Sequence, residues 1–161
     1  MKHRALIVYY SHSGNTEQIA HCIQEKTRGD LLKIEPQVAY PTDYHTVVEQ
    51  AKKEINQGYH PALATKLPDL TDYDTVFVGS PNWWSTIAPP IASFLTEANL
   101  NGKNIVPFCT HGGGGFAHLE RDMKKLCPDS NMVKGIAISG SGGKNISSTI
   151  DSWLKSIGME D

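Results

Sequence analysis

A serine-rich turn near the start of the chain has the residue types that bind a phosphate group. It lies between a short apolar run, residues 5–10, and a stretch with helical spacing that begins at Thr16. Free backbone N–H groups and the positive end of the helix dipole meet at such a junction, and Gly14 allows a close backbone approach. We therefore expect a phosphate site without lysine or metal, formed by Ser11, His12, Ser13, Gly14, Asn15 and Thr16. The alternative is a turn that only caps the helix.

A second loop, residues 79–85, carries two adjacent tryptophans after Pro81 and Asn82. Trp83 and Trp84 cannot both face one core, so at least one indole should lie partly open, where it could stack on a flat ring. The alternative is that both indoles pack beneath the loop. Beside a phosphate-binding turn, the stacking role is the favoured interpretation.

A third loop contains four consecutive glycines, residues 112–115, directly after Thr110 and His111. Glycines leave the backbone N–H groups unobstructed and adopt positive φ, so this backbone can approach the edge of a planar ligand. A flexible connector is the alternative, although ordering so many glycines costs entropy that a ligand would offset. His111 could donate a hydrogen bond, carry a positive charge, or remain a solvated loop residue.

Apolar runs with strand character alternate along the chain with stretches of helical spacing. Strands are expected at 5–10, 30–35, 75–78, 104–110 and 133–138, and helices at 16–28, from Thr42 or Asp43 to Gly58, at 89–95, 119–126 and 146–157. This alternation predicts an α/β fold, a three-layer doubly wound parallel sheet. Ligands bind such sheets beyond the carboxyl ends of the strands, near the topological switch point. The loops after the first, third and fourth strands should therefore share one edge.

Gly29 and Pro107 predict local features at the end of the first helix and within the fourth strand. Gly29 stands where a C′ glycine would end the first helix. Pro107 interrupts the fourth strand, and because proline lacks the N–H that a sheet ladder uses, we expect a bulge or gap there.

The composition is that of one globular domain, predicted to span residues 1–161. A net charge of −2 gives no support for a nucleic acid or an anionic membrane as partner. The apolar run at 5–10 is too short for a signal peptide or a membrane span, so we predict a cytoplasmic protein with free thiols at Cys22, Cys109 and Cys127. The histidines and cysteines lack metal-ligand spacing, and no metal site is predicted.

Three short motifs suggest other enzymes but lie in the wrong context. Cys22 and Arg28 match a phosphatase loop, yet they fall within a predicted helix. The run 111–114 imitates the oxyanion motif of esterases, but the chain has no nucleophile elbow. The glycines of 140–143 lack the spacing and the first-strand position of a dinucleotide fingerprint.

A phosphate cradle, an aromatic platform and a glycine-lined edge together suit a phosphorylated planar heterocycle, and here the chain resembles the flavodoxins. The phosphate loop is similar to theirs, and the closest likeness is to flavodoxin-like proteins with a Gly-Ser-Pro-Asn-Trp-Trp loop, here 79–84, and a Thr-His-Gly-Gly-Gly loop, here 110–114. The resemblance covers essentially the whole chain. It implies non-covalent FMN, strand order 2-1-3-4-5, phosphate contacts from residues 11–16, and isoalloxazine contacts from Pro81, Asn82, Trp83, Trp84, Thr110, His111, Gly112, Gly113 and Gly114.

The sequence departs from electron-carrier flavodoxins in two ways that keep several functions open. It is not strongly acidic, and its third loop lacks the aromatic residue that often covers the flavin. The leading function is an FMN-binding, flavodoxin-like electron-transfer protein. The alternatives are an NAD(P)H-dependent FMN oxidoreductase acting on quinones or similar small acceptors, and a non-redox FMN- or anion-binding domain. The partner would be a redox protein or a small-molecule acceptor, and the chain a monomer or homodimer.

Within that resemblance, Trp83 matches the stacking position better than Trp84 does. Tyr44 could approach the ring from the segment after the second strand, or simply pack. No catalytic residue is assigned.

Overall fold

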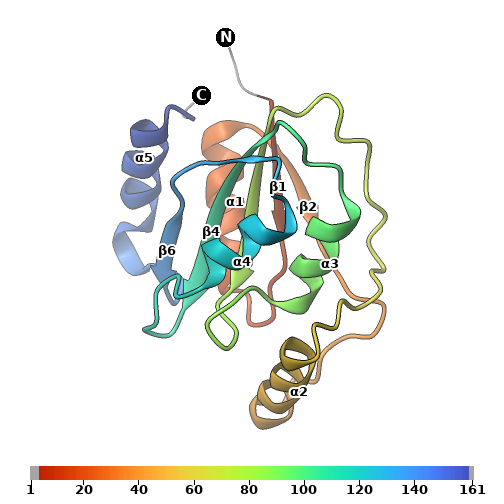
Figure 1. Ribbon diagram of the computed structural model, residues 1–161. Helices are drawn as coiled ribbons and strands as arrows, with labels where there is room; N and C mark the ends of the chain where they lie inside the picture. Colours follow the sequence, from red (N-terminus) through yellow and green to blue (C-terminus); the bar gives the residue numbers. More distant parts are fainter. Residues whose placement is uncertain (1–3, 160–161) are drawn as a thin grey trace.

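The computed structural model describes residues 4–159 and has a parallel β-sheet at its centre (Figure 1). The strands are β1 (Ala5–Tyr9), β2 (Asp30–Lys33), β3 (Thr75–Pro81), β4 (Asn104–His111), β5 (Asn131–Met132) and β6 (Ile136–Ser139). Their order is β2-β1-β3-β4-β5, and β6 also pairs with β4. All of these pairings are parallel, which confirms the predicted doubly wound sheet and its order.

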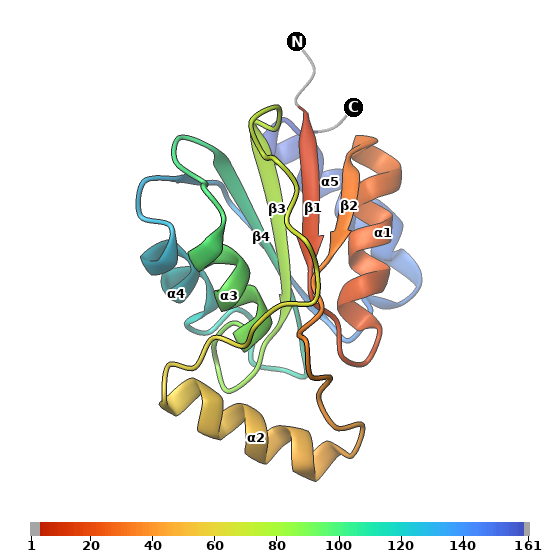
Figure 2. The same cartoon turned by 90° about the vertical axis from the view of Figure 1, so that its right-hand side faces the viewer.

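Helices cover both faces of the sheet (Figures 1 and 2). One layer consists of α1 (Asn15–Thr27) and α5 (Ile146–Ile157), which follows the short 3₁₀ helix η1 (Gly143–Asn145), and the other of α3 (Pro89–Glu97) and α4 (Leu119–Leu126). Successive β1 residues alternate between the two cores: Leu6 and Val8 lie in one, Ile7 in the other. Because both faces are covered, the strand is apolar without interruption.

The remaining helix, α2 (Tyr44–Asn56), lies apart from both layers, beyond the carboxyl ends of the strands (Figure 2). Of the two caps predicted for it, Asp43 is the one used, and its carboxylate accepts hydrogen bonds from the backbone N–H and the hydroxyl of Thr46 (3.0 and 2.7 Å). Within residues 4–159 no helix combines the length and the apolar character that crossing a bilayer requires.

The last strand of the sheet is divided into β5 and β6, and Pro107 explains the break. The fifth predicted strand, 133–138, overlaps only β6, and β5 precedes its predicted start. β4 pairs with β5 at its start and with β6 at its end, and residues 133–135 lie outside the ladder. Alternate residues of a strand bond to the same neighbour. Pro107 therefore faces the same side as Ile105, whose carbonyl accepts from the Val133 N–H (2.8 Å). The predicted gap is confirmed, but it lies in the neighbouring strand while β4 itself is continuous.

Gly29 does not end α1 through positive φ, so that prediction was wrong. The left-handed residue is Arg28, with φ 57°, and its N–H bonds to Gln24 O. A Cβ on Gly29 would lie 2.6 Å from Ile7 Cδ1 and 2.7 Å from the Ala5 carbonyl oxygen. The glycine is needed because the chain passes close to β1 there.

Candidate functional site

The loops after β1, β3 and β4 enclose a cavity of about 700 Å³ at the carboxyl ends of these strands. Many predicted site residues line it: His12, Ser13, Asn15, Pro81, Asn82, Trp83, Trp84, Thr110, His111 and Gly112. The others, Ser11, Gly14, Thr16, Gly113 and Gly114, belong to the same loops but are not among the lining residues. Residues from three separate parts of the sequence thus share one cavity, as the sheet order requires.

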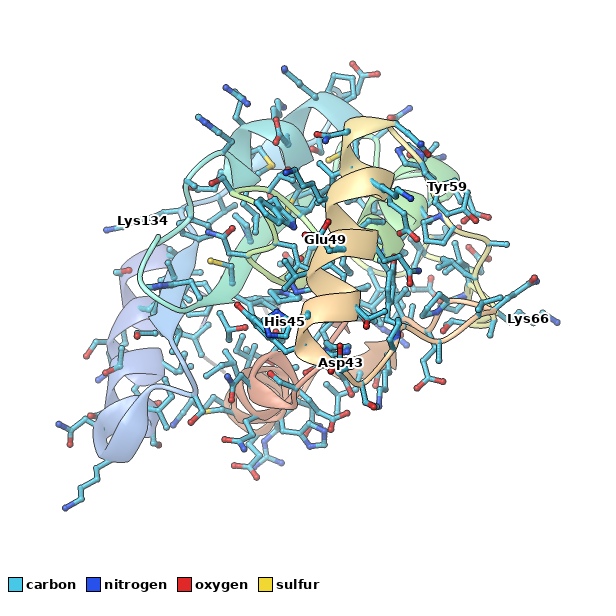
Figure 3. All side chains as sticks on the ribbon, turned by 90° about the horizontal axis from the view of Figure 1, so that it is seen from below. Asp43, His45, Glu49, Tyr59, Lys66 and Lys134 are labelled. Carbon is cyan, nitrogen blue, oxygen red and sulfur yellow. The ribbon has the colours of Figure 1, made fainter. Side chains whose placement is uncertain are left out.

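Helix α2 forms a further wall of this cavity. Four of its side chains, Tyr44, Val47, Val48 and Ala51, line the cavity, and we call them the inner face of α2. Figure 3 looks from below onto the helix, with Asp43 and His45 near its first turn and Glu49 further along. The sequence analysis assigned only Tyr44 a place near the ligand. The sequence placed Val47, Val48 and Ala51 on this helix without a functional role, because an apolar helical stripe does not reveal what it faces.

The first loop has the geometry of a helix N-terminus open to the cavity. Ser11 Oγ accepts hydrogen bonds from the backbone N–H groups of Gly14 (3.1 Å) and Glu17 (3.2 Å). Ser11 therefore caps α1 from within the loop, which is the alternative considered for this turn. Gly14 has φ 99°, with open space where a Cβ would stand. The capping role and the exposure of Ser13 to the cavity coexist in the same turn.

A buried hydroxyl pair joins the first loop to the third. Thr16 Oγ1 and Thr110 Oγ1 are 2.7 Å apart, and the two residues are 1% and 5% exposed. Their sequence separation of 94 positions makes this contact invisible to any local pattern. The pair fixes the start of α1 against the end of β4.

Trp83 lies in an aromatic cluster behind the cavity. Its ring meets those of Tyr40, Tyr10 and His12 edge to face, with centroids 5.1, 5.6 and 5.9 Å away. Burial raises the pKa of the Tyr10 and Tyr40 hydroxyls, and for Tyr40 the hydrogen bond to Glu54 adds to the effect. Both phenols therefore stay neutral, and the cluster presents a rigid apolar wall.

Trp84 has a different environment from its neighbour. Trp84 is 47% exposed, and its indole Nε1–H donates to the Val48 carbonyl of α2 (3.0 Å). Lys52 Nζ lies 5.2 Å from the centroid of the ring. The prediction that one indole lies partly open is confirmed, and the open one is Trp84.

The glycine-rich loop after β4 is held by specific hydrogen bonds. The Gly113 N–H donates to His111 Nδ1 (2.9 Å), and Asn82 Nδ2 donates to the Gly115 carbonyl (2.7 Å). Gly113 and Gly115 have φ 141° and 64°, values that favour glycine. The loop therefore has a defined conformation in which the second loop supports the third.

Within residues 4–159, the ionisable side chains that line the cavity are His12, His111 and Tyr44. Among residues 4–159, no Asp, Glu, Lys or Arg is part of the lining. Ser139, at the end of β6, and Gly140, directly after it, complete the polar side, and neither is among the predicted site residues. Burial raises the pKa of the nearby Cys109 thiol to about 12, so this cysteine offers no nucleophile. The site can therefore hold a neutral ring and an anionic group without repelling either.

Comparisons with known proteins agree with this fold. A family model described as Flavodoxin matches residues 4–157. An NAD(P)H dehydrogenase (quinone) from Azorhizobium caulinodans is 27% identical over 157 residues, covering 91% of this chain and 77% of that protein. Among solved structures, one assigned as a flavoprotein from Bacteroides eggerthii has a TM-score of 0.85 at 30% identity, over 96% of this chain and 98% of the other. A flavoprotein from Lactobacillus acidophilus in complex with FMN has a TM-score of 0.77 at 23% identity, over 94% and 98%, and shares the fold.

Proposed function

Because this chain belongs to the flavodoxin family, we propose that it binds FMN without a covalent bond in the cavity beyond the strand ends and transfers electrons through it. The observation that carries the proposal is the meeting of the three loops around a cavity whose lining, among the described residues, includes no acidic side chain. An acidic side chain there would repel the phosphate dianion.

The residues present fit the two ends of FMN. For the phosphate, His12, Ser13 and Asn15 supply polar groups beside the N-terminus of α1, and the open space at Gly14 admits an anion close to the backbone. For the ring, Pro81, the tryptophans, Thr110, His111 and Gly112 supply apolar faces and polar edges. Ser11, Thr16, Gly113 and Gly114 are not among the lining residues, so their proposed contacts with FMN would be made by backbone groups of the same loops.

The protein's contribution is to orient the cofactor and to set its surroundings. FMN supplies one-electron and two-electron redox chemistry when bound. The cluster behind Trp83 keeps water from one side of the cavity, and the neutral Tyr10 and Tyr40 add no charge there. The His111 ring, whose Nδ1 accepts from Gly113, presents its other nitrogen as a donor when the imidazole is neutral.

The second candidate function is a reductase that takes electrons from NAD(P)H and passes them to a quinone or a similar small acceptor. It is supported by the names of several relatives, including those from Azorhizobium caulinodans and Paraburkholderia phymatum. The half-open Trp84 side of the cavity also suits a small acceptor. In either case the partner is a redox protein or a redox-active small molecule.

An absorbance spectrum of the purified protein tests both candidates. Flavin bands that NADPH bleaches rapidly under nitrogen would support the reductase. Bands that resist NADPH and disappear with dithionite would support the electron carrier. A protein that shows no flavin bands after incubation with FMN would contradict the FMN assignment itself, and would favour a non-redox anion-binding role.

A further inference from the structure

The turn that carries Trp84 has an unusual backbone. Trp83 and Thr86 exchange two backbone hydrogen bonds (3.0 and 3.1 Å), so residues 84 and 85 form a two-residue hairpin loop. Trp84 has φ 54° and Ser85 has φ 68°. This is the conformation for which Asn-Gly or Gly-Gly is normally needed, and a bulky residue with positive φ is sterically unfavourable. Such strain persists only where surrounding contacts hold it.

The contacts that hold the turn lie on α2 and at the start of α4. The Trp84 indole N–H donates to the Val48 carbonyl, and Lys52 approaches the indole ring. On the opposite side, the His118 N–H donates to the Ser85 carbonyl (2.9 Å), which anchors the turn to the start of α4. Trp84 therefore connects the body of the protein to α2.

Helix α2 depends on this connection because it has few others. Only Val47 and Ala51 are buried in it, and the segments leading to and from it, 34–43 and 57–74, contain no helix or extended strand. Tyr40 bonds to Glu54, but Tyr40 itself lies in the adjoining segment. Among the described residues, Trp84 is the side chain that hydrogen-bonds this helix to a distant part of the chain.

We infer that Trp84 is a specificity-determining residue that acts by positioning α2. Its hydrogen bond sets the distance between the inner face of α2 and the loops at the strand ends, and this distance limits the size of the electron acceptor that reaches the cavity. The inference rests on the proposed function for the identity of the ligand, but not for the positioning of the helix.

Hydrogen–deuterium exchange of the FMN-loaded protein tests the positioning role. Trp84→Phe keeps an aromatic ring and removes the N–H donor, so amide exchange across residues 44–56 should accelerate about fivefold, the effect of one hydrogen bond. Ser85→Gly keeps the same turn and removes the steric cost of its positive φ, so exchange across residues 44–56 should become slower. Trp153→Phe is the matched control, because its Nε1–H also donates to a carbonyl, that of Lys134 (3.0 Å), far from α2. Unchanged exchange over 44–56 in Trp84→Phe would overturn the inference.

Reoxidation of the dithionite-reduced protein tests the effect on specificity, for a carrier and a reductase alike. We would compare the rate constants with 1,4-benzoquinone and with a naphthoquinone that carries a bulky substituent. Trp84→Phe should shift the ratio about fivefold toward the bulky quinone, and Ser85→Gly should shift it the other way. Faster exchange without a change in this ratio would mean that Trp84 is only structural. If the wild type takes up no FMN, the proposed function fails, and the exchange comparison on the flavin-free chain still decides the positioning role.

Discussion

At the scale of single residues, the site depends on hydroxyl groups in two different situations. The Thr16 and Thr110 hydroxyls bond to each other in a buried position, whereas Ser13 is exposed at the cavity. A buried hydroxyl that loses its partner leaves the other one unsatisfied, while an exposed one can turn to water. A hydroxyl group therefore serves the fold in one place and is available to a ligand in the other.

Replacing Thr16 by Val should destabilise the protein by about 1–3 kcal/mol, because the Thr110 hydroxyl would remain buried without a partner. The double variant Thr16→Val, Thr110→Val should cost less than the sum of the two single variants, since no unpaired group is left. Urea denaturation of all four proteins measures this coupling. Strictly additive costs would show that the two hydroxyls do not depend on each other.

Replacing Ser13 by Asp should raise the Kd for FMN at least about fivefold, because two like charges a few ångströms apart near a surface repel by ~1–4 kcal/mol. Ser13→Asn has a similar size and no charge, so its Kd should stay close to that of the wild type. Fluorescence titration with FMN gives both values. Equal Kd values for the two variants would place the phosphate away from residue 13.

At the scale of elements, the stability of α2, which forms a wall of the cavity, depends on pH through the cap at its first turn. The hydrogen bonds from Thr46, first that from its hydroxyl and then that from its N–H, lower the pKa of the Asp43 carboxyl below its ordinary 3.8. A folded-state pKa below the unfolded value means that the ionised form is the one stabilised. The contribution of the cap is therefore complete above pH 3.8 and is lost as the pH falls through the lower, folded-state pKa.

Amide exchange in α2 should consequently accelerate below pH 3.8 more in the wild type than in Asp43→Asn. Asparagine caps a helix as well as aspartate does but does not titrate in this range. The difference between the two proteins separates the cap from any general acid unfolding. Identical pH profiles for residues 44–56 would show that the charge of Asp43 has no part in holding the helix.

At the scale of the whole molecule, the sheet and the ligand site are coupled through the strand ends. The loops that would contact FMN are continuous with β1, β3 and β4, which lie in the middle of the sheet between two hydrophobic cores. A ligand held by these loops is therefore bound by the native state and not by the unfolded chain. Such a ligand must raise the stability of the entire domain.

FMN at a hundredfold excess over its Kd should stabilise the protein by about 2.7 kcal/mol, which corresponds to a rise in Tm of roughly 5–10 °C. Riboflavin, which has the same ring and no phosphate, should give a clearly smaller rise if residues 11–16 bind the phosphate. Thermal unfolding followed by far-UV circular dichroism, at equal concentrations of the two compounds, makes the comparison. Equal shifts would contradict the phosphate assignment, and no shift with FMN would contradict binding.

Most of the fold could be predicted because the periodicity of apolar residues reflects burial directly. The run 5–10 is apolar throughout since helices cover both faces of β1, and the prolines at 89 and 90 start α3 where their missing N–H groups do no harm. Gly29 was misinterpreted for a physical reason as well. Positive φ and close approach both select glycine, and a sequence does not distinguish them.

The sequence by itself determined the element order, the parallel sheet and the three loops at its carboxyl edge, because these depend on local spacing and on the general rules of strand connection. Only the tertiary structure decided that α2 forms a wall of the cavity, that Trp84 holds it, and that Thr16 meets Thr110. The last two of these contacts join residues 36 and 94 positions apart. Such pairings are fixed by the packing of whole elements, and no local pattern of residue types records them.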